Sequence, residues 1–157
     1  MSSFQIQVNY TINGDDENAV VRMTSAMLTP DTGGVAIDDK NKTAVFANGD
    51  INIDKGDTAD ITFALDNDDA WRLTLVQIKG KNKSDFGGSL DSDESADFPG
   101  FDANNGSFSP GAQKTSAKIQ DDNSKAKDID YRVQFTNNST NAIVYSDPRI
   151  RDSGGLN

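Results

Sequence analysis

Strict alternation of apolar and polar residues is the dominant pattern along this chain. The clearest example has an apolar residue at every second position: Phe4, Ile6, Val8, Tyr10 and Ile12. Successive side chains of a strand point to opposite faces of its sheet, so this spacing predicts a strand with one buried face. The run Asn13-Gly14-Asp15-Asp16 then predicts a turn, because Asn and Gly tolerate positive φ.

Further short segments with strand-like patterning follow, separated by turn residues. Strands are predicted at residues 20–28, 35–38, 43–46, 50–53, 58–65, 71–79, 115–120, 129–135 and 142–145. Within 71–79 the apolar phase slips between Leu75 and Val76, so we expect a β-bulge there. Asp147-Pro148 interrupts the last strand, since proline cannot donate to a ladder.

No segment shows a sustained helical stripe, and many short strands between turns are typical of a sandwich or barrel. We therefore predict an all-β chain that forms one antiparallel β-sandwich domain over residues 1–157. Between about residues 80 and 114 the alternation fails. A long irregular insert of this kind is usually a functional or a mobile loop.

Two of the predicted strands resemble parts of an immunoglobulin-type sandwich. Trp71 opens one strand, and Tyr131 lies near the start of another. In that fold a tryptophan on strand C packs on the core, and a tyrosine near the start of strand F anchors a corner. The resemblance implies an immunoglobulin-like layout without the disulfide of antibody domains, because the chain has no cysteine.

A second resemblance lies in the C-terminal part. The motif Tyr131-Arg132-Val133, followed by a strand ending in Tyr145 and by Asp147-Pro148, resembles the C-terminal hairpin of the DP-EP family. These are small, uncharacterised, bacterial all-β proteins. The resemblance covers roughly the last quarter of the chain and implies a bacterial source and no known enzyme activity. It carries over no functional residues.

Composition narrows the chemistry. The chain has no histidine and no cysteine, which excludes a Ser-His-Asp triad, a Cys-His pair, the usual zinc sites and haem or iron–sulfur ligation by those residues. Its formal charge of −10 argues against nucleic acid and anionic membrane surfaces as partners, since both need clustered Lys and Arg. No apolar run is long enough to span a membrane. The first residues lack the pattern of a secretory signal, so a cytoplasmic location is expected if the chain is full length.

Acidic residues gather at the predicted turns, and carboxylate oxygens are the ligands that calcium prefers. If every strand reverses direction, the turns at 66–69 and 121–127 share one end of the sandwich, and those at 13–18, 38–42 and 80–114 share the other. The first two are short, so we select their acids as candidate calcium ligands: Asp66, Asp68, Asp69, Asp121 and Asp122. We favour the alternative that these are solvated turns that keep a β-protein soluble.

One acidic run in the insert has the ligand spacing of an EF-hand loop: Asp91, Asp93, Ser95, Asp97 and Asp102. Ala96 stands where that loop needs glycine, and no flanking helices are predicted. We do not assign an EF-hand here.

The insert also holds half of the eight phenylalanines of the chain: Phe86, Phe98, Phe101 and Phe108. These rings either pin the insert over the sandwich or project as anchors for a protein partner, with acidic residues as the rim. We favour packing, because exposed aromatic rings promote aggregation.

The function expected from these features is a non-catalytic binding or structural module, with no required cofactor and with a protein partner or a second copy bound through edge strands. The alternative is a calcium-stabilised carbohydrate- or surface-binding module. A carboxylate-based hydrolase is the second alternative. It is disfavoured because a sugar cleft needs aromatic residues, and the single tryptophan, Trp71, is expected in the core.

Overall fold

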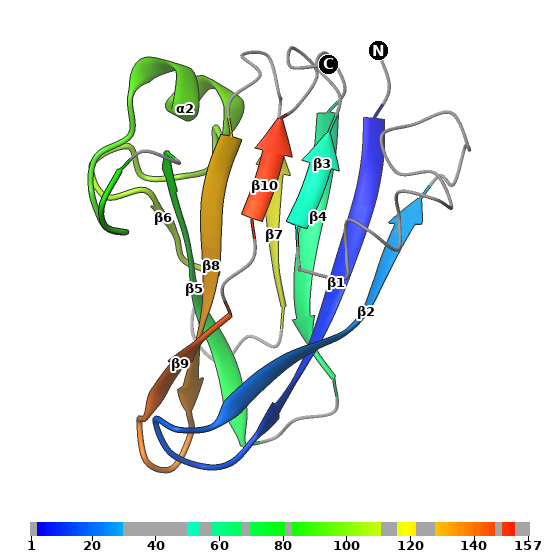
Figure 1. Ribbon diagram of the computed structural model, residues 1–157, viewed down its shortest axis with the longest axis vertical. Helices are drawn as coiled ribbons and strands as arrows, with labels where there is room; N and C mark the ends of the chain where they lie inside the picture. Colours follow the sequence, from blue (N-terminus) through cyan, green and yellow to red (C-terminus); the bar gives the residue numbers. More distant parts are fainter. Residues whose placement is uncertain are drawn as a thin grey trace.

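The structure is a computed structural model that describes residues 3–29, 50–53, 58–66, 70–80, 83–110, 116–121, 128–146 and 149–152. Strands dominate these ranges, as Figure 1 shows, so the all-β prediction is confirmed. The strands are β1 (Ser3–Asn13), β2 (Val20–Thr29), β3 (Asp50–Ile53), β4 (Thr58–Leu65), β5 (Trp71–Gly80), β6 (Ser107–Phe108), β7 (Ser116–Asp121), β8 (Asp128–Asn137), β9 (Ile143–Tyr145) and β10 (Arg149–Asp152). The one helix within the described ranges is α2 (Ser92–Asp97). Two predicted strands, 35–38 and 43–46, lie outside them.

The strands form two sheets. The first has the order β2-β1-β4-β7, and the second has the order β3-β10-β8-β5-β6, with β9 also paired to β8. Most neighbours are antiparallel, but β1 runs parallel to β4 and β10 runs parallel to β3. The sheets are therefore mainly antiparallel, as predicted, and they contain two parallel pairs that were not predicted. Turn residues indicate only how consecutive strands of the chain are connected. The two parallel pairs join strands that are distant in sequence, so no turn predicts them.

The hydrophobic core combines the buried faces of both sheets. Alternate residues of β4 are buried, and β5 follows the same alternation on each side of its bulge. Across the core the ring centroids of Tyr10 and Phe135 lie 5.5 Å apart, and those of Phe63 and Tyr131 lie 5.1 Å apart. Aromatic pairs at this spacing add to the area that they bury. Trp71 is buried, as predicted.

Strand β5 contains the predicted bulge. Its register with β8 shifts between Leu73 and Leu75, one residue before the predicted position. Leu73 and Val76 are buried, whereas Thr74 and Leu75 between them are both half-buried. Because of the one extra residue, the buried residues of β5 have odd numbers before the bulge and even numbers after it. This explains the phase slip in the sequence.

The last two strands lie one after the other along one edge of β8, whose other edge is taken by β5. β9 pairs with the later part of β8, and β10 pairs with its first residues. Between them the backbone N–H of Ser146 donates to the carbonyl of Val133 (2.9 Å), and its hydroxyl accepts from the N–H of Val133 (3.2 Å). The predicted interruption of the last strand is confirmed, because β9 ends at Tyr145 and β10 begins at Arg149. Asp147 and Pro148 themselves lie outside the described residues.

The ends of β1, β4 and β8 lie at one end of the molecule, at the bottom of Figure 1. The N–H of Asp66, just after β4, donates to the carbonyl of Tyr10 (2.9 Å). The indole Nε1 of Trp71 donates to the carbonyl of Gly14 (3.0 Å) in the turn after β1. The insert leaves β5 at Gly80, the opposite end of that strand from Trp71, and α2 lies at the top of Figure 1.

The predicted grouping of the turns is therefore wrong. Residues 13–18 share an end with the segment after β4 and not with the insert, because β1 and β4 are parallel neighbours that end together. If each successive predicted strand reversed direction, β4 would run opposite to β1, whereas the two strands are parallel.

Candidate binding face

The proposed calcium ligands are not brought together where the structure describes them. Asp66 follows the last residue of β4, whereas Asp121 pairs with Ala59 near the first residue of that strand. Seven residues of extended chain separate their backbones by about 20 Å. One calcium ion holds its ligand oxygens at about 2.5 Å, so these two carboxylates cannot ligate the same ion. The other candidates lie outside the described residues: Asp68, Asp69 and Asp122.

The first part of the run with EF-hand spacing is helical over Ser92–Asp97, and Asp102 lies beyond the helix in a bridge to Ser107. Asp91 is the N-cap of α2, and its side chain accepts from the N–H of Glu94 (2.8 Å) while Glu94 accepts from the N–H of Asp91 (2.9 Å). This reciprocal pair is a capping box. Asp97 is buried. Over the described ranges, no group of three or more acidic side chains is close enough to hold a metal ion.

Three of the four phenylalanines in the insert pack together. The ring centroids of Phe98 and Phe101 lie 5.7 Å apart, and those of Phe101 and Phe108 lie 5.8 Å apart. Phe98 and Phe101 are buried in the core cluster, and Phe108 packs against it. These rings pin the insert onto the second sheet, so Phe98 and Phe101 are not available as anchors for a partner.

Phe86 behaves differently, because it lies against the outward side chains of β5 and β8. The guanidinium carbon of Arg132 lies 4.6 Å from the centroid of the Phe86 ring, and the Nζ of Lys79 lies 5.2 Å from it. Arg132 also lies 3.9 Å from the ring centroid of Tyr145 on β9. A cation at these distances from aromatic rings is attracted by their quadrupoles. The Nε of Arg132 also donates to the side-chain oxygen of Gln77 (2.8 Å), which further fixes the orientation of the guanidinium.

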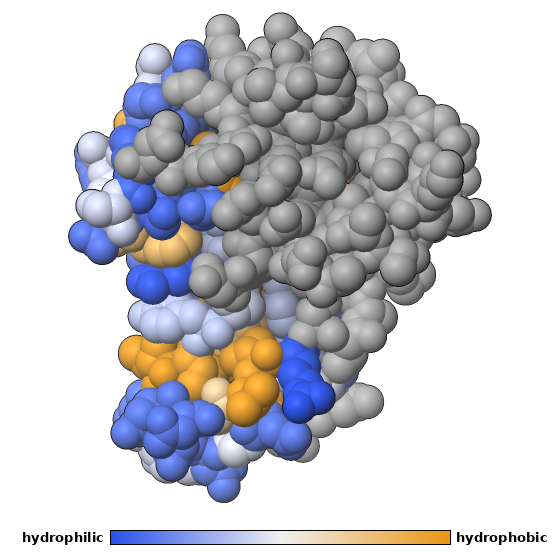
Figure 2. Space-filling model, viewed as in Figure 1, coloured by the Kyte–Doolittle hydropathy of each residue, from blue (hydrophilic) through white to orange (hydrophobic). Residues whose placement is uncertain are grey.

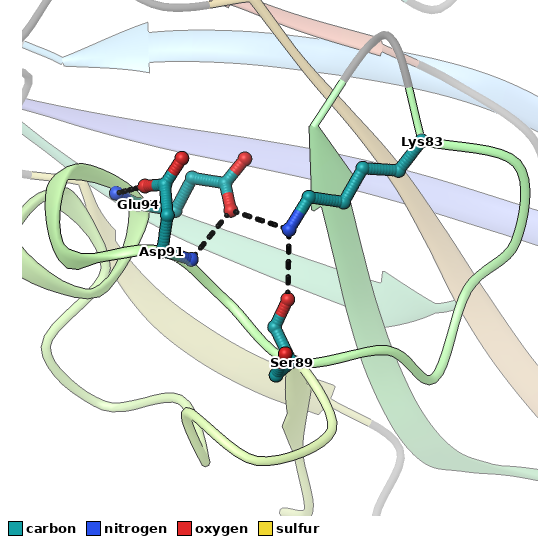
Figure 3. Close-up of polar contacts among 4 residues, drawn as sticks. All are labelled: Lys83, Ser89, Asp91 and Glu94. Atoms are coloured by element: carbon teal, nitrogen blue, oxygen red, sulfur yellow. Dashed lines mark hydrogen bonds and ion pairs between the residues drawn. The ribbon is translucent and has the colours of Figure 1, made fainter.

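The loop that carries Phe86 is closed at its base by Lys83, as Figure 3 shows. The Nζ of Lys83 donates to the carbonyl of Ser89 (2.9 Å) and lies 3.6 Å from Oε1 of the buried Glu94. One lysine thus links both ends of the loop to the capping box of α2. Gly87 has a φ of 96°, a conformation that favours glycine, so the chain can turn directly after Phe86.

Most other polar groups on this face are already paired with one another. Lys79 makes an ion pair with Asp130 (3.1 Å). The hydroxyls of Thr74 and Thr136 share a hydrogen bond (3.0 Å), and Gln134 donates to Thr74 (3.0 Å). Farther along, Arg72 donates to Asn138 (2.9 Å). The face is thus largely self-satisfied.

Arg132 is the exception. The acceptor of its hydrogen bond, the amide oxygen of Gln77, carries no charge, and none of the carboxylates within the described ranges forms an ion pair with it. Asp130, two residues away on the same face, is engaged by Lys79. A half-buried cation held between two rings, in a chain of formal charge −10, is left without a counter-charge on the described part of this face.

Exposed apolar side chains lie on the strands next to β8 and at the start of β2. The large apolar or aromatic side chains classed as exposed among the described residues are Val20 (51%), Ile143 (43%) and Tyr145 (41%). Ile143 and Tyr145 flank the buried Val144 on β9, so both point outward. Figure 2 shows apolar surface gathered at the end of the molecule where β9 and the beginning of β2 lie. We name the set Phe86, Arg132, Tyr145 and Ile143 the outer strip.

Of the outer strip, sequence reasoning selected only Phe86. Arg132 and Tyr145 were named only as part of the resemblance of the C-terminal hairpin to the DP-EP family, and not as candidate site residues. A usable signal was present, because Arg132 occupies an outward position of an alternating strand. What the sequence could not show is that Phe86, from the insert, and Tyr145, from β9, lie on either side of it.

No helix in the described ranges is long and apolar enough to cross a membrane. No protein-family model matches the chain, and no curated protein matches it either.

Proposed function

We propose that this chain is a non-catalytic binding module with an immunoglobulin-like sandwich layout, and that the outer strip is its ligand-binding surface. The layout is supported by strand neighbours: β4 pairs with β7 as strands B and E do, and β5, β8 and β9 follow one another as C, F and G do. Trp71 and Tyr131 are buried on the strands that would correspond to C and F. The parallel β1–β4 pair is a departure from that layout.

The single observation that carries the binding proposal is the placement of Arg132 between Phe86 and Tyr145. Binding energy concentrates on aromatic and arginine side chains that are held in place before the ligand arrives. Arg132 is held by two rings and by Gln77, and Tyr145 remains 41% exposed beside it. Such an arrangement, oriented before a ligand arrives, is suited to recognition.

The test probes the intact chain with a random peptide display library and with a glycan array. At least one ligand is expected whose binding weakens about tenfold or more in Tyr145→Ala, because truncating an anchoring aromatic side chain costs more than about 1.4 kcal/mol. Asn104→Ala, an exposed position in the insert, is the matched control and should bind as wild type. If every ligand found binds Tyr145→Ala as well as wild type, the outer strip is not the binding surface.

A further inference from the structure

We propose that the outer strip recognises an acidic peptide segment in which a carboxylate lies beside an apolar side chain, with Arg132 taking the carboxylate and Ile143 and Tyr145 taking the apolar group. This inference rests on the proposed function and names the class of its ligand.

The charge of the ligand follows from Arg132. A guanidinium presents its remaining N–H donors as a fork that matches a carboxylate. In Arg132 the Nε–H is used by Gln77, and the rings of Phe86 and Tyr145 cover the guanidinium, so the group is oriented before any ligand binds. Among the side chains that the structure describes, two carboxylates lie close in the chain to Arg132 or Phe86: Asp130 is paired with Lys79, and Asp85 is an exposed residue beside Phe86. Neither provides Arg132 with an ion pair.

The apolar part of the ligand follows from the edge of the face. Ile143 and Tyr145 are 43% and 41% exposed on β9, which pairs with β8, and Val20 at the start of β2 is 51% exposed. Burying such apolar side chains against a ligand is favourable, in proportion to the area that is removed from water. A ligand that contacted only Arg132 would leave Ile143 and Tyr145 exposed to water. We therefore expect the ligand to carry an apolar group beside its carboxylate.

A peptide fits this face better than a sugar does. A sugar is held mainly through hydrogen bonds to its many hydroxyl groups, but the polar side chains around Arg132 are already bonded to one another. A peptide needs little more than one carboxylate contact and one apolar contact at its anchor residues. An acidic polysaccharide is therefore the competing outcome of the experiment.

The experiment pans the peptide library against the full chain and measures the affinity of the enriched peptides for three variants. We expect Asp or Glu next to an apolar residue in the enriched sequences. Arg132→Ala should weaken binding about 10- to 100-fold, since a hydrogen bond to a charged group contributes about 1.5 to 3 kcal/mol. Arg132→Lys should recover part of the loss, because the charge remains but the planar fork does not. Arg22→Ala removes an exposed arginine on β2 and should bind as wild type.

Three results would overturn the inference. The first is enrichment of peptides without acidic residues, and the second is an equal loss in Arg22→Ala, which would mean attraction by charge alone. The third is an absence of peptide ligands together with binding of polygalacturonate that depends on Tyr145. In that case the proposed function stands and the ligand class is wrong. Ligands that are all indifferent to Tyr145→Ala contradict both.

Discussion

The Nζ of Lys83 lies 3.6 Å from Oε1 of Glu94, although the lysine side chain is 43% exposed and the glutamate side chain only 3%. Loss of the ion pair would therefore cost the buried Glu94 side chain more than the exposed Lys83 side chain. Lys83 can turn to water if its partner is lost. Glu94 cannot, because its carboxylate is buried between the N-terminus of α2 and Gly80, where a Cβ would clash with it.

This asymmetry predicts that Lys83→Met is more damaging than Glu94→Gln. Lys83→Met leaves a buried carboxylate without a cation, which we expect to lower the stability of the insert by about 1 to 3 kcal/mol. Glu94→Gln keeps an oxygen for the N–H of Asp91 and removes the buried charge, so its cost should stay below about 1 kcal/mol. Native-state hydrogen exchange of the Ser95 and Phe98 amides measures both effects.

The double variant Lys83→Met with Glu94→Gln is the control for this pair. It should be more stable than Lys83→Met alone, since the second change removes the stranded charge. A greater loss in Glu94→Gln than in Lys83→Met would mean that the capping contact, and not the ion pair, governs the insert.

The phenylalanines of the insert predict a second contrast. Phe98 is fully buried and packs edge-on against Phe101, so Phe98→Ala should lower the free energy of unfolding by about 3 to 5 kcal/mol. Phe86 is half-buried and contacts two cations, so Phe86→Ala should cost only about 1 kcal/mol. Urea unfolding measures both. Similar losses for the two variants would contradict the assignment of one ring to the core and the other to the surface.

The sequence predicts individual strands well because alternation is a local signal. Residues Trp71 and Leu73 on one side of the slip, and Val76 and Ile78 on the other, were sufficient to place a bulge to within one residue. Sheet order is not local. The parallel pairing of β1 with β4 joins residues such as Ile6 and Ile61, and no turn between them reveals it. Because the sheet order was unknown, the acidic turns were assigned to the wrong ends of the sandwich.

The same limit applies to the candidate site. Four phenylalanines in an irregular insert indicated a packing role, and the pairing of Phe98 with Phe101 agrees. Nothing in the sequence separates Phe86 from the other three, because all four stand among Gly, Ser, Asp and Asn. Only the fold of the loop, with Lys83 bonded to Ser89 across its base, directs Phe86 toward Arg132.

No calcium ion shared by Asp66 and Asp121 should stabilise the chain, because Asp66 follows the end of β4 whereas Asp121 of β7 pairs near its start. If that shared site is the only candidate for calcium, the thermal unfolding midpoint should be the same in millimolar calcium and in chelator. A bound ion at 100 times its dissociation constant would add about 2.7 kcal/mol and shift the midpoint clearly upward. Magnesium at equal ionic strength is the control. A rise with calcium alone that Asp66→Asn removes would restore the metal-binding alternative.

The hydroxyl of Tyr10 provides the last prediction. It is buried, and no group among the described residues lies in good hydrogen-bonding geometry to it, although the side chains of Ser146 and Tyr131 are close enough to lower its pKa. An unsatisfied buried polar group costs about 1 to 3 kcal/mol. Tyr10→Phe keeps the ring that packs against Phe135 and removes only this group, so it should raise the free energy of unfolding at neutral pH by about 1 kcal/mol. Urea unfolding measures the change.

The same hydroxyl predicts how stability depends on alkaline pH. Burial raises the pKa of Tyr10 well above its ordinary value, and the neighbouring hydroxyls of Ser146 and Tyr131 offset only part of the rise. Above about pH 10 the unfolded chain loses this proton while the folded chain keeps it, so stability falls as pH rises. The decline contributed by one such group approaches about 1.4 kcal/mol per pH unit, and Tyr10→Phe should remove it. An identical alkaline decline in wild type and variant would mean that folding does not raise the pKa of Tyr10. Lower stability of the variant at pH 7 would mean that the hydroxyl is hydrogen-bonded in solution.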